Sequence, residues 1–98
     1  MPGVTRKNVD ASTGHGGYPS RPNTPNGSND VIVNGYGVVR IDDAWPSHTD
    51  PGPPDTHSGS QNGGSSTVIA NGKGVARIGD SISCGDSVGA GSSDVICG

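Results

Sequence analysis

The chain has 98 residues, a formal net charge of −3 and 28% hydrophobic residues, with one Trp, two Tyr and no Phe. This length predicts one domain spanning residues 1–98. Its six Lys and Arg residues do not cluster, which argues against nucleic-acid binding. The longest aliphatic run, residues 31–33, is far too short to cross a bilayer, and residues 1–7 lack the apolar segment of a secretory signal peptide.

The small apolar content raises the question of how the chain folds. The chain contains 18 Gly and 8 Pro residues, a composition close to that of disordered chains. A domain of this size that buries little apolar surface usually needs a disulfide, a metal or a partner. Cys84 and Cys97 allow at most one intrachain disulfide, so they cannot form a disulfide framework.

A gapless internal repeat argues against disorder. Residues 27–43 align with residues 64–80, and both copies contain a β-branched run, an Asn-Gly pair and an alternating return segment. Asn34-Gly35 and Asn71-Gly72 suit the positive φ angles of a type I′ turn. Each copy therefore predicts a β-hairpin, and no segment shows helical periodicity.

The two ends of the chain complete the repeat. Residues 91–98 match its first half, and residues 4–10 echo the Val-x-Arg-x-x-Asp part of its second half. We therefore predict three units, at about residues 4–43, 44–80 and 81–98, if the ends meet in space. The segments between hairpins, such as residues 46–64, are rich in Pro, Gly, Ser and Asp and predict loops.

The three histidines and Cys84 follow the repeat register. His57 and Cys84 each lie seven residues before a repeat, whereas His15 and His48 each lie five residues after an Asp of the repeat. Around a pseudo-three-fold axis, the loops carrying them would converge at one end. Three imidazoles and one thiolate form a reasonable closed zinc site, structural rather than catalytic, and suit iron less well. Cys97 is an alternative ligand or a disulfide partner of Cys84, but its place in a strand favours a buried apolar role.

Other polar residues give weaker signals. Asp50, Asp55 and Asp86 lack the spacing of a known calcium loop and are expected to be solvated loop residues. No nucleophile motif such as G-x-S-x-G occurs, so we do not expect an enzyme. Trp45 is expected to anchor a core or a loop.

Gly64–Asp80 and the following Ser83-Cys84-Gly85, with Gly14–Gly17 and Asp43–Trp45, resemble the PAAR-repeat proteins. The Pro-Ala-Ala-Arg tetrapeptide that names the family is degenerate here, as Gly37–Arg40 and Gly74–Arg77, which marks a divergent member. The resemblance covers about residues 4–98. It implies an all-β, cone-shaped domain of three short hairpins with zinc near the apex, held by His15, His48, His57 and Cys84.

The resemblance also implies a function. Such a chain would be a monomer that caps a trimeric β-helical spike, either a VgrG-like spike of type VI secretion or the central spike of a phage baseplate. The capped spike would contact and pierce the target membrane, and the chain would reside in the virion tail or be secreted through the contractile apparatus. The alternative is an adaptor that recruits a toxin effector to the spike.

Overall fold

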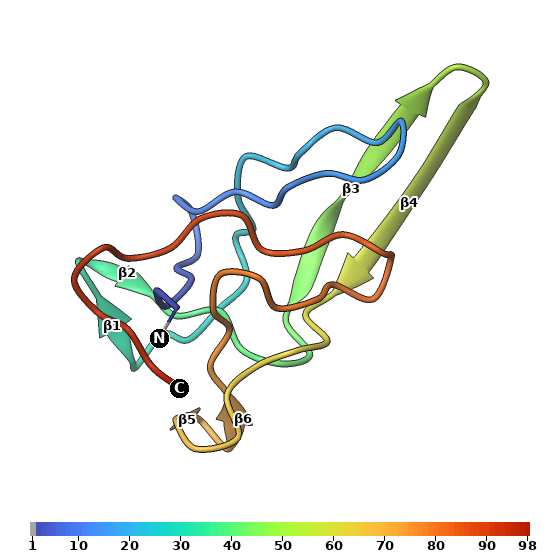
Figure 1. Ribbon diagram of the computed structural model, residues 1–98. Helices are drawn as coiled ribbons and strands as arrows, with labels where there is room; N and C mark the ends of the chain where they lie inside the picture. The colour runs from blue at the N-terminus through green and yellow to red at the C-terminus, as the bar shows by residue number, and fades with distance from the viewer. Residues whose placement is uncertain (1) are drawn as a thin grey trace.

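The computed structural model describes residues 2–98; Met1, the first residue of the predicted domain, lies outside this part of the chain. The described chain is all-β and measures 40 × 24 × 21 Å along its principal axes. None of its segments forms a helix long and apolar enough to cross a membrane. Three antiparallel two-stranded sheets are present (Figure 1): β1 (Ile32–Val33) with β2 (Tyr36–Gly37), β3 (Ala44–Pro51) with β4 (Pro54–Ser60), and β5 (Ile69–Ala70) with β6 (Lys73–Gly74).

The two predicted Asn-Gly hairpins are confirmed as β1–β2 and β5–β6. Asn34 and Gly35 have φ angles of 52° and 85°, and Asn71 and Gly72 have 55° and 79°. These angles are those of type I′ turns, which favour Asn and Gly. The strands are only two residues long, because the return segments soon leave the hairpin and pair with neighbouring units instead.

The two ends of the chain meet and pair as the strands of the two hairpins do, although the rest of the chain rather than a turn joins them; we call this pair of chain ends the third hairpin. Gly3 pairs with Ile96, as Gly37 pairs with Ile32 in the first hairpin. The Val4 amide donates to the Val95 carbonyl at 2.9 Å. The two ends of the chain therefore lie side by side, which is what the repeat predicts if residues 91–98 and 4–10 complete one unit. We call the end of the molecule that contains these three hairpins the base; β3–β4 projects away from it (Figure 1).

A closed triangle of backbone hydrogen bonds lies on the pseudo-three-fold axis. Thr5 donates to Ala76 at 3.0 Å, Ala76 donates to Val39 at 2.8 Å, and Val39 donates to Thr5 at 2.9 Å. These residues occupy equivalent repeat positions, and each is fully buried. Because every amide finds its partner in another unit, the triangle joins the three units directly.

Three equivalent serines form a second ring around the same axis. Ser28 donates to the Asn71 side chain at 2.6 Å, and Ser92 donates to the Asn34 side chain at 2.6 Å. Ser65 donates to the backbone carbonyl of Gly98, which occupies the repeat position of the two asparagines, at 2.5 Å. Each serine oxygen also accepts two backbone amides of its own turn, so it fixes both the turn and the contact with the next unit.

The longest hairpin, β3–β4, corrects the prediction of loops over residues 46–64. Its strands carry mostly polar, exposed side chains, so they lack the apolar alternation that marks a strand in a sequence. Cross-strand pairing holds them instead, with Thr49 and Thr56 hydroxyls 2.7 Å apart. The buried Trp45 anchors the start of β3.

The buried apolar residues form two small clusters. The base contains Val4, Val38, Ala70, Val75 and Cys97, with Val33 packed against them. The second cluster, Trp45, Ile82 and Val88, lies beside β3 with Cys84 against it. The Trp45 indole donates to Gln61 at 2.9 Å, so the predicted role of this Trp as an anchor is confirmed. Both cysteines are free thiols, and Cys97 is a buried core residue as expected.

The repeat packs so closely that it requires glycine at one position of each unit. A Cβ atom on Gly37 would overlap the carbonyl oxygen of Ser28, and Gly74 and Gly3 meet Ser65 and Ser92 in the same way. We expect Gly37→Ala to lower the free energy of unfolding by about 1–3 kcal/mol, since overpacking forces the backbone to shift. Chemical denaturation would measure it. Gly52→Ala is the matched control, because a Cβ at Gly52 meets no atom within 4 Å, and it should not lower stability.

Candidate metal centre

The β3–β4 hairpin places two histidines side by side. His48 and His57 are directly paired across the two strands. Side chains of a directly opposed pair lie on the same face of the ribbon, a few ångströms apart. The sequence predicts loops at both histidines, which is wrong: they lie on paired strands, and this pairing fixes their separation.

The other two candidate ligands, His15 and Cys84, each lie in a tight turn. His15 lies in a turn closed by hydrogen bonds between His15 and Tyr18 in both directions, at 3.1 and 2.8 Å, with Gly14 and Gly16 at positive φ. Cys84 lies in a turn closed by the Gly85 amide, which donates to Ile82 at 3.0 Å. Gly85 has a φ of 103°, a conformation that glycine adopts readily and other residues rarely do.

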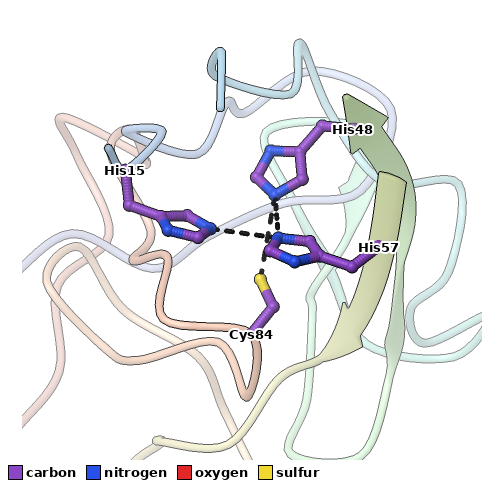
Figure 2. Close-up of side chains that lie close together, drawn as sticks. All are labelled: His15, His48, His57 and Cys84. Carbon is purple, nitrogen blue, oxygen red and sulfur yellow. Dashed lines mark hydrogen bonds between the residues drawn. The ribbon is translucent and has the colours of Figure 1, made fainter. Parts of the chain in front are cut away.

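The four side chains converge on one point (Figure 2). His57 Nε2 lies 2.7 Å from His48 Nε2 and 3.1 Å from His15 Nε2, and Cys84 Sγ lies 4.0 Å from His48 Nε2. One ligand atom from each residue lies within 4.8 Å of all the others. His48 is buried, and the other three are partly buried.

The chemistry of these donors suits a bound cation. His48 Nδ1 lies 2.9 Å from the Pro19 carbonyl, which only accepts, so the ring proton belongs on Nδ1. His48 Nε2 then presents a lone pair to the cluster. His57 Nε2 faces His15 Nε2 and His48 Nε2 and carries at most one proton. Hydrogen bonds alone therefore cannot satisfy all three of these ring nitrogens. A metal ion accepts every lone pair, and a backbone carbonyl that orients a ligand histidine is typical of metal sites.

The surroundings of His57 favour its neutral form. Burial, followed by the positive charges of His48 and His15 when protonated, lowers the pKa of His57 below its ordinary value. A metal-binding imidazole must be neutral. The pKa shift therefore acts in the direction that ligation requires.

Tyr18, which the sequence analysis did not single out, covers the histidines. Its ring stacks on His57, with centroids 4.0 Å apart and 15° between planes, and on His15 at 4.9 Å and 21°. Its hydroxyl donates to Asp55, and this bond, with partial burial, raises the pKa of Tyr18 to about 12. The phenol thus stays protonated and serves as a cover rather than an anionic ligand.

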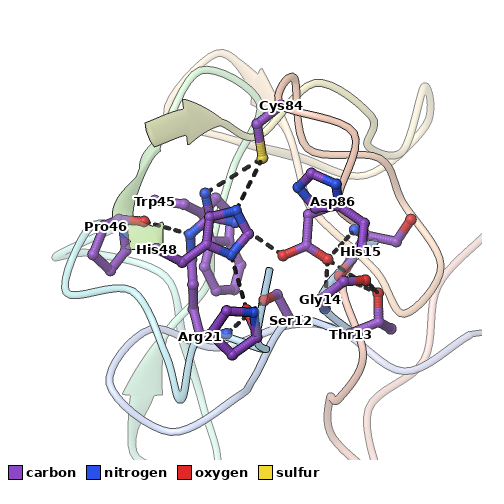
Figure 3. A network of polar contacts seen from close by, with 12 residues as sticks. Ser12, Thr13, Gly14, His15, Arg21, Trp45, Pro46, His48, Cys84 and Asp86 are labelled. Atoms are coloured by element: carbon purple, nitrogen blue, oxygen red, sulfur yellow. Dashed lines mark hydrogen bonds and ion pairs between the residues drawn. The ribbon is translucent and has the colours of Figure 1, made fainter. Parts of the chain in front are cut away.

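Asp86 corrects a second expectation, because it is buried rather than solvated. It forms an ion pair with the equally buried Arg21, 2.9 Å from Nη1 to Oδ2, and accepts bonds from the Gly14 and Ser87 amides (Figure 3). Burial raises the pKa of Asp86, but the surrounding hydroxyls and amides lower it by more, so the net shift is downward. Asp50 and Asp55 lie on β3 and β4, at their turn.

The fold and the cluster together define a small all-β domain with three hairpins around one axis and a His₃Cys group near the projecting end. The PAAR motif family matches residues 10–90 of the 98 residues. The chain therefore belongs to the PAAR-motif family, and the sequence resemblance is confirmed. Members of this family are structural proteins of the spike tip in contractile injection systems of secretion machinery and phages. No curated protein was found to match the chain.

Proposed function

We propose that this chain is the tip protein that caps a trimeric β-helical spike and is stabilised by a structural zinc ion. Residues 1–98 would form one domain of three units, at about 4–43, 44–80 and 81–98. The chain would act in a phage tail or as a secreted component of the contractile apparatus. The observation that carries the proposal is the pseudo-three-fold base, together with the family membership.

Exposed apolar side chains recur around the base with three-fold regularity. Ile32, Ile69 and Ile96 occupy equivalent repeat positions and are 53%, 54% and 53% exposed. The valines that precede them, Val31, Val68 and Val95, are exposed as well. Such equal exposure means that a partner meets the same chemistry three times around one axis.

A homotrimer is the partner that best fits this surface. The end of a trimeric β-helix presents three identical apolar surfaces and three unpaired strand edges, which must be covered by another protein. One chain with three similar units can contact all three subunits alike, so we propose a monomer seated on a trimer. A VgrG-like spike or a phage central spike has this symmetry.

Zinc is the metal we propose at His15, His48, His57 and Cys84. Three imidazoles and a thiolate fill a tetrahedral shell, which leaves no open position for water or substrate. The ion would therefore be structural. It would join β3–β4 to two turns far apart in sequence, and this cross-link supports a tip that must not unfold under load. Iron suits this mixed nitrogen and sulfur set less well.

Co-expression with a trimeric spike protein from the same genome tests the proposal. We expect a complex of one tip chain per spike trimer, measured by native mass spectrometry, with one zinc ion per tip chain measured by elemental analysis. A stable complex with a toxin effector and none with the spike would instead favour the adaptor function. Binding to neither would contradict both.

A further inference from the structure

Arg21 stands apart from the other arginines of the chain. Arg6, Arg40 and Arg77 occupy equivalent repeat positions, and each forms a partly buried ion pair with an aspartate of its own turn. Arg21 lies outside the repeat, and its side chain is 1% exposed. A buried guanidinium is costly unless each of its nitrogens has a partner.

All three guanidinium nitrogens of Arg21 are engaged, and one of them contacts a candidate metal ligand (Figure 3). Nη1 donates to Asp86 Oδ2 at 2.9 Å, and Nε donates to the Pro46 carbonyl on β3. Nη2 donates to Cys84 Sγ at 3.3 Å. The sulfur thus faces the three imidazoles on one side and a buried cation on the other.

The geometry points to Arg21 as a positioning residue that holds the Cys84 thiolate by a charge-assisted N–H···S hydrogen bond and orients it toward the three histidines. This inference rests on the proposed metal centre and adds a residue to it. The bond partly offsets the negative charge of the sulfur, which would otherwise be buried beside Asp86. Arg21 also ties β3 to the Cys84 turn, so the ligands from these two segments keep one relative position.

Lysine cannot replace arginine in this role. The three acceptors lie in three directions, and the planar guanidinium offers donors along all of them, whereas an ammonium is a single point charge. In metal sites, loss of a group that orients a ligand typically weakens metal binding about 10- to 100-fold. Arg21→Lys keeps the charge and tests the directed hydrogen bond.

The wild-type protein, loaded with ¹¹³Cd and labelled with ¹⁵N-arginine, gives the most direct test. We expect a scalar coupling between the cadmium nucleus and an Arg21 Nη proton, transmitted through the Cys84 sulfur. Stoichiometric cadmium without this coupling would overturn the inference alone. A chain that binds no cadmium, zinc or cobalt would overturn the metal centre and this inference together.

Arg21→Lys provides the second measurement. In the cobalt-substituted variant we expect the sulfur-to-cobalt charge-transfer band to move to lower energy, and zinc affinity to fall about 10- to 100-fold. Arg40→Lys is the matched control, since Arg40 forms an ion pair of 2.9 Å with Asp43 away from the cluster; it should leave both quantities unchanged. A folded Arg21→Lys protein with the wild-type band and affinity would refute the inference, and if it fails to fold, the cadmium coupling decides.

Discussion

Replacing His57 or Cys84 by alanine is expected to abolish stoichiometric zinc binding and to destabilise the domain severely. The two buried apolar clusters are small, so metal binding is expected to supply much of the stability. A ligand present at 1,000 times its dissociation constant stabilises the folded state by about 4 kcal/mol. In a domain of this size each kcal/mol corresponds to about 4–8 °C in melting temperature, so we expect a fall of roughly 15–30 °C. Calorimetry and elemental analysis of the same samples measure both effects.

Cys97→Ala is the matched control for this experiment. Cys97 is the other free cysteine and packs in the base cluster with Val4 and Val75. It should keep one zinc ion per chain and lose only the modest stability that a smaller buried side chain costs. A strong chelator added to the wild type should reproduce the loss in His57→Ala. Full zinc content and an unchanged melting temperature in either ligand variant would show that the ligand assignment is wrong.

Aspartate at the base is expected to abolish capping without affecting the metal. Ile69→Asp would bring a carboxylate into the proposed apolar interface, and a change at the centre of such an interface often costs 2 kcal/mol or more, about 30-fold in affinity. The triple variant at Ile32, Ile69 and Ile96 should show no detectable binding to the spike trimer. Surface plasmon resonance with immobilised spike measures the affinity, and zinc content reports whether the variants remain folded.

Ser58→Asp controls for the added charge. Ser58 is exposed on β4, in the hairpin that projects away from the base (Figure 1), so its substitution should leave spike affinity unchanged. If Ile69→Asp and the triple variant bind the spike as tightly as the wild type, the base is not the docking surface. Equal losses in Ser58→Asp and Ile69→Asp would indicate a general effect of charge rather than a contact.

The hairpins of the base were predictable because local chemistry determines them. Asn34-Gly35 and Asn71-Gly72 accept positive φ angles, and the β-branched residues before them favour strands. The β3–β4 hairpin was not predictable in this way. Its strands are polar at most positions and its turn is rich in proline. These are also the sequence features of a loop, so the sequence alone does not distinguish this hairpin from a loop.

The four clustered side chains could be predicted because the chain contains few residues of the right type and the repeat relates their positions. The residues that support them could not. Tyr18 stacks on His57, and the spacing of residues in the sequence gives no sign of this contact. Arg21 and Asp86 lie 65 residues apart, and only the folded chain brings them together. One signal did exist: Arg21 is the arginine that has no counterpart in the repeat.

The third hairpin has a consequence for the order in which the molecule can fold. Gly3 pairs with Ile96, so this hairpin cannot form until almost the whole of residues 2–98 has been synthesised. Both rings on the pseudo-three-fold axis need that hairpin, since Thr5 and Ser92 each belong to it. Contacts between residues so distant in sequence slow folding, because a long loop must close before they form. The base therefore cannot be completed before residues 91–98 have been synthesised, so a shorter nascent chain does not present the whole of the proposed docking surface.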